Sequence, residues 1–346
     1  MSNGSKLKSS FILSGRILIP AVLAAAVVIS GKFVGLRQGY GIVFVLLGGA
    51  ALALMSFSFP EIVAAFRCAA SGRGSRADIR TSGLFWEALA RSFWMLGVLA
   101  SVISFVNSLN SASRSIADVA SGMAASLVPS VYGIVLGAIC LVPAWKLRGK
   151  LHQQPPEVAP LNAARPDRKT RAYWRMETII GYVLFVVLVV WTAVRPVLSA
   201  SSISFKSWTW FFSWPAALII LGGTMAFALF VEDVAAGTPL TASFAVTALI
   251  GSLMGFIQVL LGFASAYIGK ASTDNIASAM AFIISSCFLG LSGMILIGAP
   301  LEDRMVKTGR VDRPSALSRA SWSVFPLVAL IFLVMTFFLV ITPVRK

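Results

Sequence analysis

Few side chains in this sequence could do chemistry, and the most notable are hydroxyl groups set in apolar stretches. Ser130, Ser252 and Ser286 each lie within a long hydrophobic run. An ion such as H⁺ or Na⁺ needs oxygen atoms in place of water when it crosses hydrocarbon, and a carboxylate that holds and releases it. A serine in an apolar helix also bonds the carbonyl of the preceding turn or tightens helix packing, for about 1 kcal/mol. Both roles are open from the residues alone.

Carboxylates are absent from the middle of every apolar run. Asp118 and Asp274 stand at the starts of two runs. At those positions they can cap a helix, where a negative charge favours the N-terminal end of the helix dipole, or line an outer ion vestibule. His152 is the only histidine, and the three cysteines are scattered without CxxC spacing. We therefore expect no metal, no cofactor and no conventional enzyme active site.

The composition indicates a membrane protein. Hydrophobic residues make up 58% of the 346 residues and charged residues 12%, a balance that a soluble domain of this length could not keep in water. The net charge of +16 is explained by membrane topology and attraction to anionic lipid, which we favour over binding of nucleic acid.

Nine apolar runs are near the length of about 20 residues that a helix needs to cross a bilayer. The expected spans are 17–35, 40–59, 92–110, 119–145, 178–198, 210–230, 245–268, 275–299 and 322–341. Basic loops are expected at 60–91 and 301–320, and a basic, proline-containing linker at 151–174. The sequence thus predicts an all-α polytopic protein with about nine transmembrane helices.

Orientation follows from the distribution of basic residues. With the N-terminus in the cytoplasm, the inner segments carry 21 of the 29 Lys and Arg residues. Cytoplasmic loops of membrane proteins are enriched in these residues. The prediction is a cytoplasmic N-terminus and a C-terminus on the outer side.

The chain also contains an internal repeat. When Gly290 is aligned with Gly133, Met280 falls on Met123 and Pro300 on Pro143. Because each unit has four expected spans, both copies enter the membrane in the same direction. The predicted organisation is a first four-helix repeat at 1–150, the linker at 151–174, a second repeat at 175–303, and a basic loop with a ninth helix at 304–346.

Small residues within the expected spans allow neighbouring helix backbones to come close. The glycines expected to pack helices in this way are Gly133, Gly137, Gly251, Gly255 and Gly290.

Several motifs resemble the MotA/TolQ/ExbB ion-channel components of bacterial membrane motors. Residues 122–124, 130–133 and 143–147 resemble the last helix of the flagellar-stator subunit, and 251–257 is similar to the family's Gly-Thr-Leu-Ile-Gly run. Residues 220–224 resemble its Gly-Gly-Thr helix. In order and spacing, the resemblance extends over most of residues 12–303 as two tandem copies.

The ninth expected span has a second similarity. Residues 325–329 and 337–342 look like the single helix of the ExbD/TolR partner. The ion-carrying aspartate of that helix corresponds to Ala329 here, so a separate partner would have to supply the carboxylate.

The resemblance implies a channel or scaffold subunit of an ion-driven complex in the bacterial inner membrane, a homo-oligomer acting with a MotB- or ExbD-like single-span partner. It makes Ser130, Ser252 and Ser286 the candidates for the ion path. The segment 60–91 is much shorter than the family's cytoplasmic domain, so direct drive of a flagellar rotor is not expected. Two alternatives stay open, a non-conducting scaffold and a small-solute transporter with parallel repeats.

Overall fold

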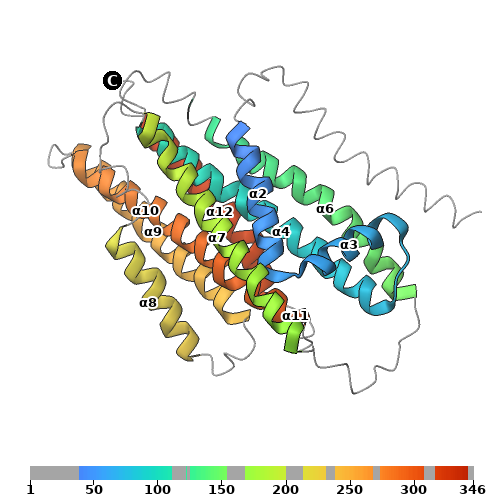
Figure 1. Ribbon diagram of the computed structural model, residues 1–346. Coiled ribbons are helices and arrows are strands. Elements are labelled where there is room, and N and C mark those ends of the chain that lie inside the picture. The colour runs from blue at the N-terminus through green and yellow to red at the C-terminus, as the bar shows by residue number, and fades with distance from the viewer. Residues whose placement is uncertain are drawn as a thin grey trace, which may run out of the picture.

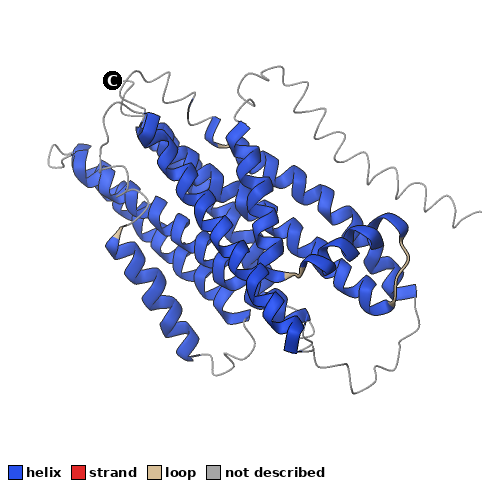
Figure 2. Ribbon diagram, viewed as in Figure 1, coloured by secondary structure: helices blue, strands red, loops and turns tan. Residues whose placement is uncertain are grey.

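The computed structural model of the chain describes residues 39–110, 122, 125–153, 168–199, 213–230, 238–267, 273–307 and 316–341. Within these ranges the chain forms helices joined by short connections and contains no strand (Figure 2). The fold is therefore all-α, as the sequence predicts. The first expected span, 17–35, lies outside the described residues.

Three helices of the N-terminal half pack into one unit. α2 (Gly39–Ser56), α4 (Arg76–Asn110) and α6 (Val128–Gln153) contact one another, and α4 and α6 form the most extensive interface of the described part. α4 has 35 residues and is therefore about 52 Å long at 1.5 Å per residue. Since the hydrocarbon core of a bilayer is only about 30 Å thick, the charged N-terminal turns of α4 project beyond it.

Three helices of the C-terminal half repeat this pattern of contacts. α8 (Trp214–Phe230), α9 (Thr238–Tyr267) and α10 (Thr273–Gly293) pack together, with α9 and α10 as the most extensive pair and α8 against both (Figure 1). We call the two groups of three helices the first unit and the second unit.

Two further helices join the units. α7 (Arg168–Ser199) precedes α8 in the chain but packs mainly against α2 of the first unit. A Cβ atom built on Gly181 of α7 would lie 2.7 Å from the carbonyl oxygen of Ala51, so the two backbones are nearly in contact. α12 (Ala316–Ile341) packs mainly against α9 and also touches α4.

The segment expected as a basic loop at 60–91 is instead helical. It contains α3 (Phe59–Ser71) and the first half of α4, and α3 is bent by 112° from α2. The backbone N–H of Ser58 donates to the Glu61 carboxylate at 2.9 Å, which caps the start of α3. Gly72 ends the helix with a φ of 65°, a left-handed conformation that suits glycine. Capping interactions therefore favour helices in this segment, although its basic charge suggests a loop.

The helix of the eighth expected span also continues further than predicted. α10 runs through a π-helical segment, η4 (Met294–Gly298), into α11 (Ala299–Lys307). The expectation of a loop from residue 301 is therefore wrong for 301–307, which form one more amphipathic helical stretch.

The π-helical turn has an identifiable cause. Pro300 has no N–H and cannot bond to the carbonyl of Leu296 four residues earlier. The backbone N–H of Ala299 bonds to the carbonyl of Met294, five residues back. The hydroxyl of Tyr182 on α7 donates to the carbonyl of Leu296 at 2.8 Å. A side chain from another helix thus satisfies the carbonyl that Pro300 leaves open.

Four described helical stretches are long and apolar enough to span a membrane: Arg76–Ser108, Val128–Gln153, Leu240–Gly262 and Ser278–Lys307. The bent pair of α2 and α3 raises the number to five if it counts as one span. Shorter apolar helices occur at Met176–Thr192, Trp214–Met225 and Ala320–Phe332. The described residues thus support four to five spans, fewer than the nine expected.

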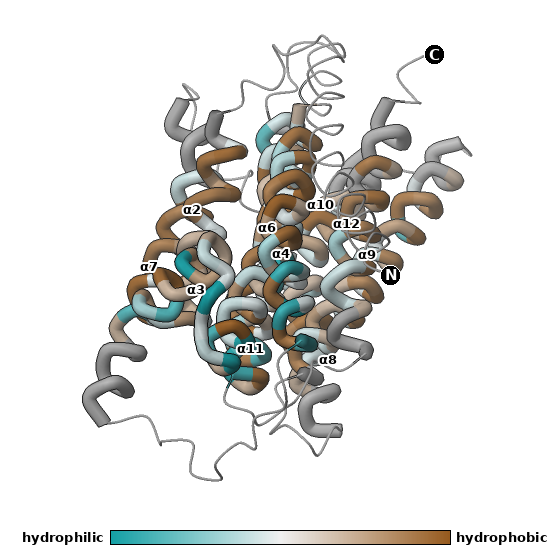
Figure 3. Tube along the Cα trace, turned by 90° about the vertical axis from the view of Figure 1, so that its right-hand side faces the viewer, coloured by the Kyte–Doolittle hydropathy of each residue, from teal (hydrophilic) through white to brown (hydrophobic). Residues whose placement is uncertain are grey.

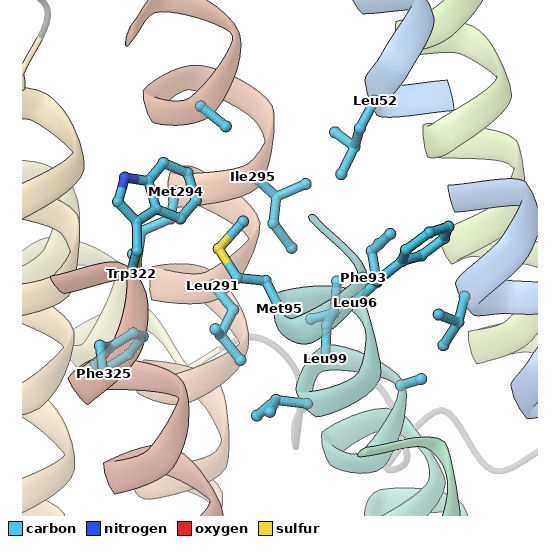
Figure 4. Packing of buried hydrophobic residues seen from close by; sticks show 14 of the residues in the cluster. Leu52, Phe93, Met95, Leu96, Leu99, Leu291, Met294, Ile295, Trp322 and Phe325 are labelled. Carbon is cyan, nitrogen blue, oxygen red and sulfur yellow. The ribbon is translucent and has the colours of Figure 1, made fainter. Parts of the chain in front are cut away.

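Apolar side chains occur both in the core and on the outside of the bundle, and Figure 3 shows hydrophobic residues along the helices. The core joins the two units, because Met95 of α4 faces Leu291 and Met294, with Trp322 and Phe325 of α12 beside them (Figure 4). The outward faces of α7, α8 and α9 carry exposed Ile, Leu, Val and Met side chains, which is the surface that a lipid environment favours.

Candidate functional site

Ser130 lies in the first turn of α6 against α4. Its Oγ is 2.7 Å from Oγ of Ser101 on α4, and its backbone N–H donates to the same oxygen at 3.1 Å. The first N–H groups of a helix have no partner within the helix. Both serines are buried. Ser101 therefore caps α6 from a neighbouring helix, and the hydroxyl pair holds the two helices together.

Glycines bring α4 and α6 into backbone contact beside this pair. A Cβ atom on Gly133 would lie 2.4 Å from the carbonyl oxygen of Phe93 and 2.9 Å from Cα of Gly97. One on Gly137 would lie 3.0 Å from the carbonyl oxygen of Ala90. The structure thus places Gly133 and Gly137, expected as packing residues, at a close helix crossing.

The two serines of the second unit lie between α9 and α10. The hydroxyl of Ser252 donates to the carbonyl of Ala248 at 2.7 Å, and its oxygen is 3.3 Å from Sγ of Cys287. Ser286 is fully buried, and its hydroxyl has no hydrogen-bond partner among the described residues. A Cβ atom on Gly251 would lie 2.6 Å from this hydroxyl oxygen.

The remaining glycines of the second unit also face neighbouring helices. A Cβ on Gly255 would lie 2.6 Å from Cγ1 of Ile283, and one on Gly290 would lie 2.2 Å from Cβ of Ala248. In both cases the nearest atom belongs to a side chain. At Gly97 and Gly133 it belongs to the backbone.

The candidate site residues therefore fall into two separate interfaces. Ser130 lies in the α4–α6 interface, whereas Ser252 and Ser286 lie in the α9–α10 interface. Asp118 lies outside the described residues. Asp274 belongs to the first turn of α10, where only the path of the backbone is described.

Ala329 lies on the buried face of α12. It is 1% exposed and shares this face with Trp322, Phe325 and Phe332. The ring of Phe332 packs against that of Phe256 on α9, with centroids 5.8 Å apart. Position 329, which the sequence analysis compares with the aspartate of a single-span partner, thus packs within the chain's own core.

Sequence reasoning missed a buried ionic cluster between α4 and α11. Nη2 of Arg91 lies 2.6 Å from Oδ1 of Asp303, and Nη1 lies 3.7 Å from Oε1 of Glu302. Glu302 is fully buried and Asp303 is 10% exposed. Because a buried charge is costly without a partner, each group of this cluster depends on the others.

Two other helices complete the surroundings of Glu302. Oε2 of Glu302 accepts a hydrogen bond from Nε1 of Trp322 on α12 at 2.9 Å and one from the hydroxyl of Thr241 on α9 at 3.3 Å. The guanidinium of Arg91 also stacks over the Trp322 ring, 5.1 Å from its centroid. Four helical segments, α4, α9, α11 and α12, therefore meet at one carboxylate.

α11 also makes polar contacts with α2, α7 and α3. Nη2 of Arg304 donates to the carbonyl of Met55 on α2 at 2.9 Å and to the hydroxyl of Thr178 on α7 at 2.7 Å. Lys307 forms an ion pair with Glu61 of α3. α11 is thus the element through which polar groups connect the two units.

A sequence signal for this cluster exists. Arg91 precedes an apolar run, and the Glu-Asp-Arg triplet at 302–304 follows Pro300. Interpreted as loop charges, these residues do not indicate a pair, although Arg91 is positive and Glu302 and Asp303 are negative.

Residues 71–158 match the model of the MotA/TolQ/ExbB proton channel family. The matched segment contains α4, α6 and the connection between them. No curated protein and no solved structure matches the chain. The family match therefore coincides with the helix pair that brings together Ser101, Ser130, Gly97 and Gly133, and it supports a membrane-complex subunit of the proton-channel kind.

The described geometry limits the chemistry available. Among the residues that the structure describes, no group of three or more His, Cys, Asp or Glu could hold a metal ion. What the arrangement offers is buried oxygen atoms in two helix interfaces and one buried acid–base cluster.

Proposed function

We propose that this chain is a channel or scaffold subunit of an ion-driven membrane complex of the MotA/TolQ/ExbB kind, using H⁺ or Na⁺. The observation that carries the proposal is the coincidence of the family match with the α4–α6 pair. There two hydroxyl oxygens are buried beside a backbone-to-backbone glycine contact. Buried oxygens at a helix crossing are the groups that an ion path through hydrocarbon requires.

In this proposal the second unit is a second copy of the same helix arrangement. A Cβ on Gly97 would lie 2.8 Å from the carbonyl oxygen of Pro129, and one on the corresponding Gly251 would meet Ser286. Ser286 corresponds to Pro129 in the alignment that places Gly290 on Gly133. Equivalent glycines facing equivalent positions support repeats at 1–150 and 175–303, separated by the linker at 151–174 and followed by the ninth helix.

The complex would be a homo-oligomer in a bacterial inner membrane, with the N-terminus of each chain in the cytoplasm and nine spans. A single-span partner with an intramembrane aspartate would supply the carboxylate, since position 329 carries alanine. The oxygens of Ser130, Ser252 and Ser286 would line or support the ion path, with Asp118 and Asp274 at its outer end.

Purification from the native membrane in mild detergent tests the proposal. The intact assembly is weighed by native mass spectrometry and the co-purifying proteins are identified. An oligomer that carries a small single-span protein with an intramembrane aspartate is the expected result. A monomer or homodimer without such a companion would overturn the channel proposal.

A non-conducting scaffold is the second candidate, and one observation favours it. The hydroxyls of Ser130 and Ser252 both have hydrogen-bond partners within the protein, as serines with a purely structural role do. Dissipating the protonmotive force separates the two candidates, because only the conducting complex depends on it for its cellular activity.

A further inference from the structure

The corner formed by α2, α3 and α4 has features of a lipid-binding site, and these are independent of the function proposed above. The 112° bend turns α3 across the direction of α2. α3 exposes two aromatic side chains, Phe59 at 61% and Phe66 at 52%. Aromatic side chains favour the membrane–water interface, and an amphipathic helix of this kind lies in its plane.

α3 is held firmly at this corner by α6 and α4. The ammonium groups of Lys146 and Lys150 donate to the carbonyls of Ala69 and Gly72 at 3.1 Å and 2.6 Å. Both carbonyls are at the C-terminal end of α3, where positive charge is favoured. On the other side, Nε1 of Trp86 on α4 donates to a carbonyl of α3. The corner is thus a preformed surface.

Two adjoining open hollows of about 530 Å³ and 450 Å³ lie at this corner and share Arg73 and Gly74. We call the two hollows together the groove. The first is apolar at the end lined by Phe59 and Val63, and it becomes basic at Arg67 and Arg73. The second adds Lys150. The groove therefore has an apolar end next to the exposed aromatic ring and a basic end at the turn between α3 and α4.

One acid, Asp78, also lines the groove. Its carboxylate accepts hydrogen bonds from the hydroxyl of Ser75 at 2.7 Å and from the Ser75 backbone at 3.3 Å, so it caps the start of α4. Arg67 and Arg73 are both exposed, which leaves two guanidinium groups facing solvent against one capped carboxylate.

We propose that this groove binds an anionic phospholipid of the adjacent leaflet. The phosphate lies at Arg67 and Arg73, since guanidinium groups match phosphate geometry, and an acyl chain lies along Phe59 and Val63. A free anion would use only the basic end, whereas a phospholipid uses both ends.

Lipid titration of the purified full-length protein, followed by native mass spectrometry, tests the site. The probes are phosphatidylglycerol, phosphatidylcholine of the same acyl chains, and inorganic phosphate. The expected result is tighter binding of phosphatidylglycerol than of phosphatidylcholine. Arg73→Gln should weaken phosphatidylglycerol binding about fivefold, and Arg67→Gln/Arg73→Gln correspondingly more.

The matched control is Arg80→Gln, which removes one exposed arginine of α4 outside the groove and should leave binding unchanged. Phe59→Ser should weaken binding of phosphatidylglycerol but not of phosphate. Equal binding of the two lipids, an equal loss in Arg80→Gln, or competition by inorganic phosphate alone would each overturn the proposal. The first two would indicate no site, and the third an anion site.

Discussion

The α4–α6 and α9–α10 interfaces both combine close-packed glycines with buried serines, but different atoms are in contact. In the first unit, glycines face backbone atoms, and the hydroxyls of Ser101 and Ser130 bond each other. In the second unit, the corresponding glycines face side chains, and the hydroxyl of Ser286 has no partner among the described residues. Backbone atoms are in contact across the first interface. The second interface contains a buried hydroxyl oxygen that could still accept or donate a hydrogen bond.

This difference distinguishes serines that hold helices together from a serine that could contact an ion. A hydroxyl that already donates and accepts within the protein contributes mainly to helix association. A buried hydroxyl without a protein partner is costly unless water or an ion completes it. If an ion passes through this chain, Ser286 is a better candidate for contact than Ser130.

The two units are joined by the ionic cluster between α4 and α11. Breaking this cluster should have the largest effect on stability. Arg91→Ala leaves the buried Glu302 and Asp303 without their guanidinium, and we expect a loss of about 3–5 kcal/mol in stability. The control is Glu87→Gln, which breaks the exposed pair of Glu87 with Arg148 and should cost about 0–1 kcal/mol. Thermal unfolding in detergent measures both. Similar melting temperatures would mean that α11 does not join the units.

Substituting corresponding glycines tests the contrast in contact atoms. Gly97→Ala pushes a methyl against the backbone of α6 and should cost about 2–3 kcal/mol. Gly251→Ala meets the Ser286 hydroxyl, which can rotate away, so the cost should be nearer 1 kcal/mol. Gly222→Ala is the control, because nothing lies within 4 Å of its Cβ position. Equal losses at residues 97 and 251, measured by thermal unfolding, would remove the distinction between the interfaces.

Removing one serine from each interface tests whether the two act in one ion path. Ser130→Ala/Ser252→Ala should reduce ion flux by the co-purified complex in liposomes while membrane abundance stays near that of the wild type. Each lost hydrogen bond costs only about 1 kcal/mol. Unchanged flux would exclude both serines from the path.

The smallest expected effect is on stability at Ser286. Ser286→Ala removes a buried hydroxyl that has no partner in the described residues, so unfolding should be unchanged or shifted by up to about 1 kcal/mol toward stability. Ser101→Ala is the matched comparison, and it should cost about 1 kcal/mol because it removes the hydroxyl that bonds both Oγ and the backbone N–H of Ser130. A clear destabilisation by Ser286→Ala would show that this hydroxyl has a structural partner.

Much of the fold follows from the sequence because apolar length is a strong signal. The runs at 92–110 and 322–341 fall within helices of the structure, and the run at 245–268 falls within α9 up to residue 267, where the described residues end. The glycines chosen for small size also lie at close crossings, since spacing along a helix fixes which face they share.

The polar link was not predictable by the same reasoning. The charge of the segments 60–91 and 301–320 predicts loops, and these segments contain Arg91, Glu302 and Asp303. Their pairing depends on how α11 is rotated, which neither composition nor periodicity specifies. Ser101 was missed for a related reason, because nothing distinguishes it from the other serines of its apolar run until the position of the opposite helix end is known.

The π-helical turn before Pro300 can also be understood as an angular offset. A helix advances by about 100° per residue, and a π turn holds one residue more than an α turn without lengthening the fold by a full turn. Everything after Gly298 is therefore rotated relative to a continuous α-helix. An uninterrupted helix would carry Glu302 away from Arg91 and toward a different neighbour. The extra residue in η4 thus sets how α11 is rotated about its axis, and with it which side chains of the two halves of the chain pair.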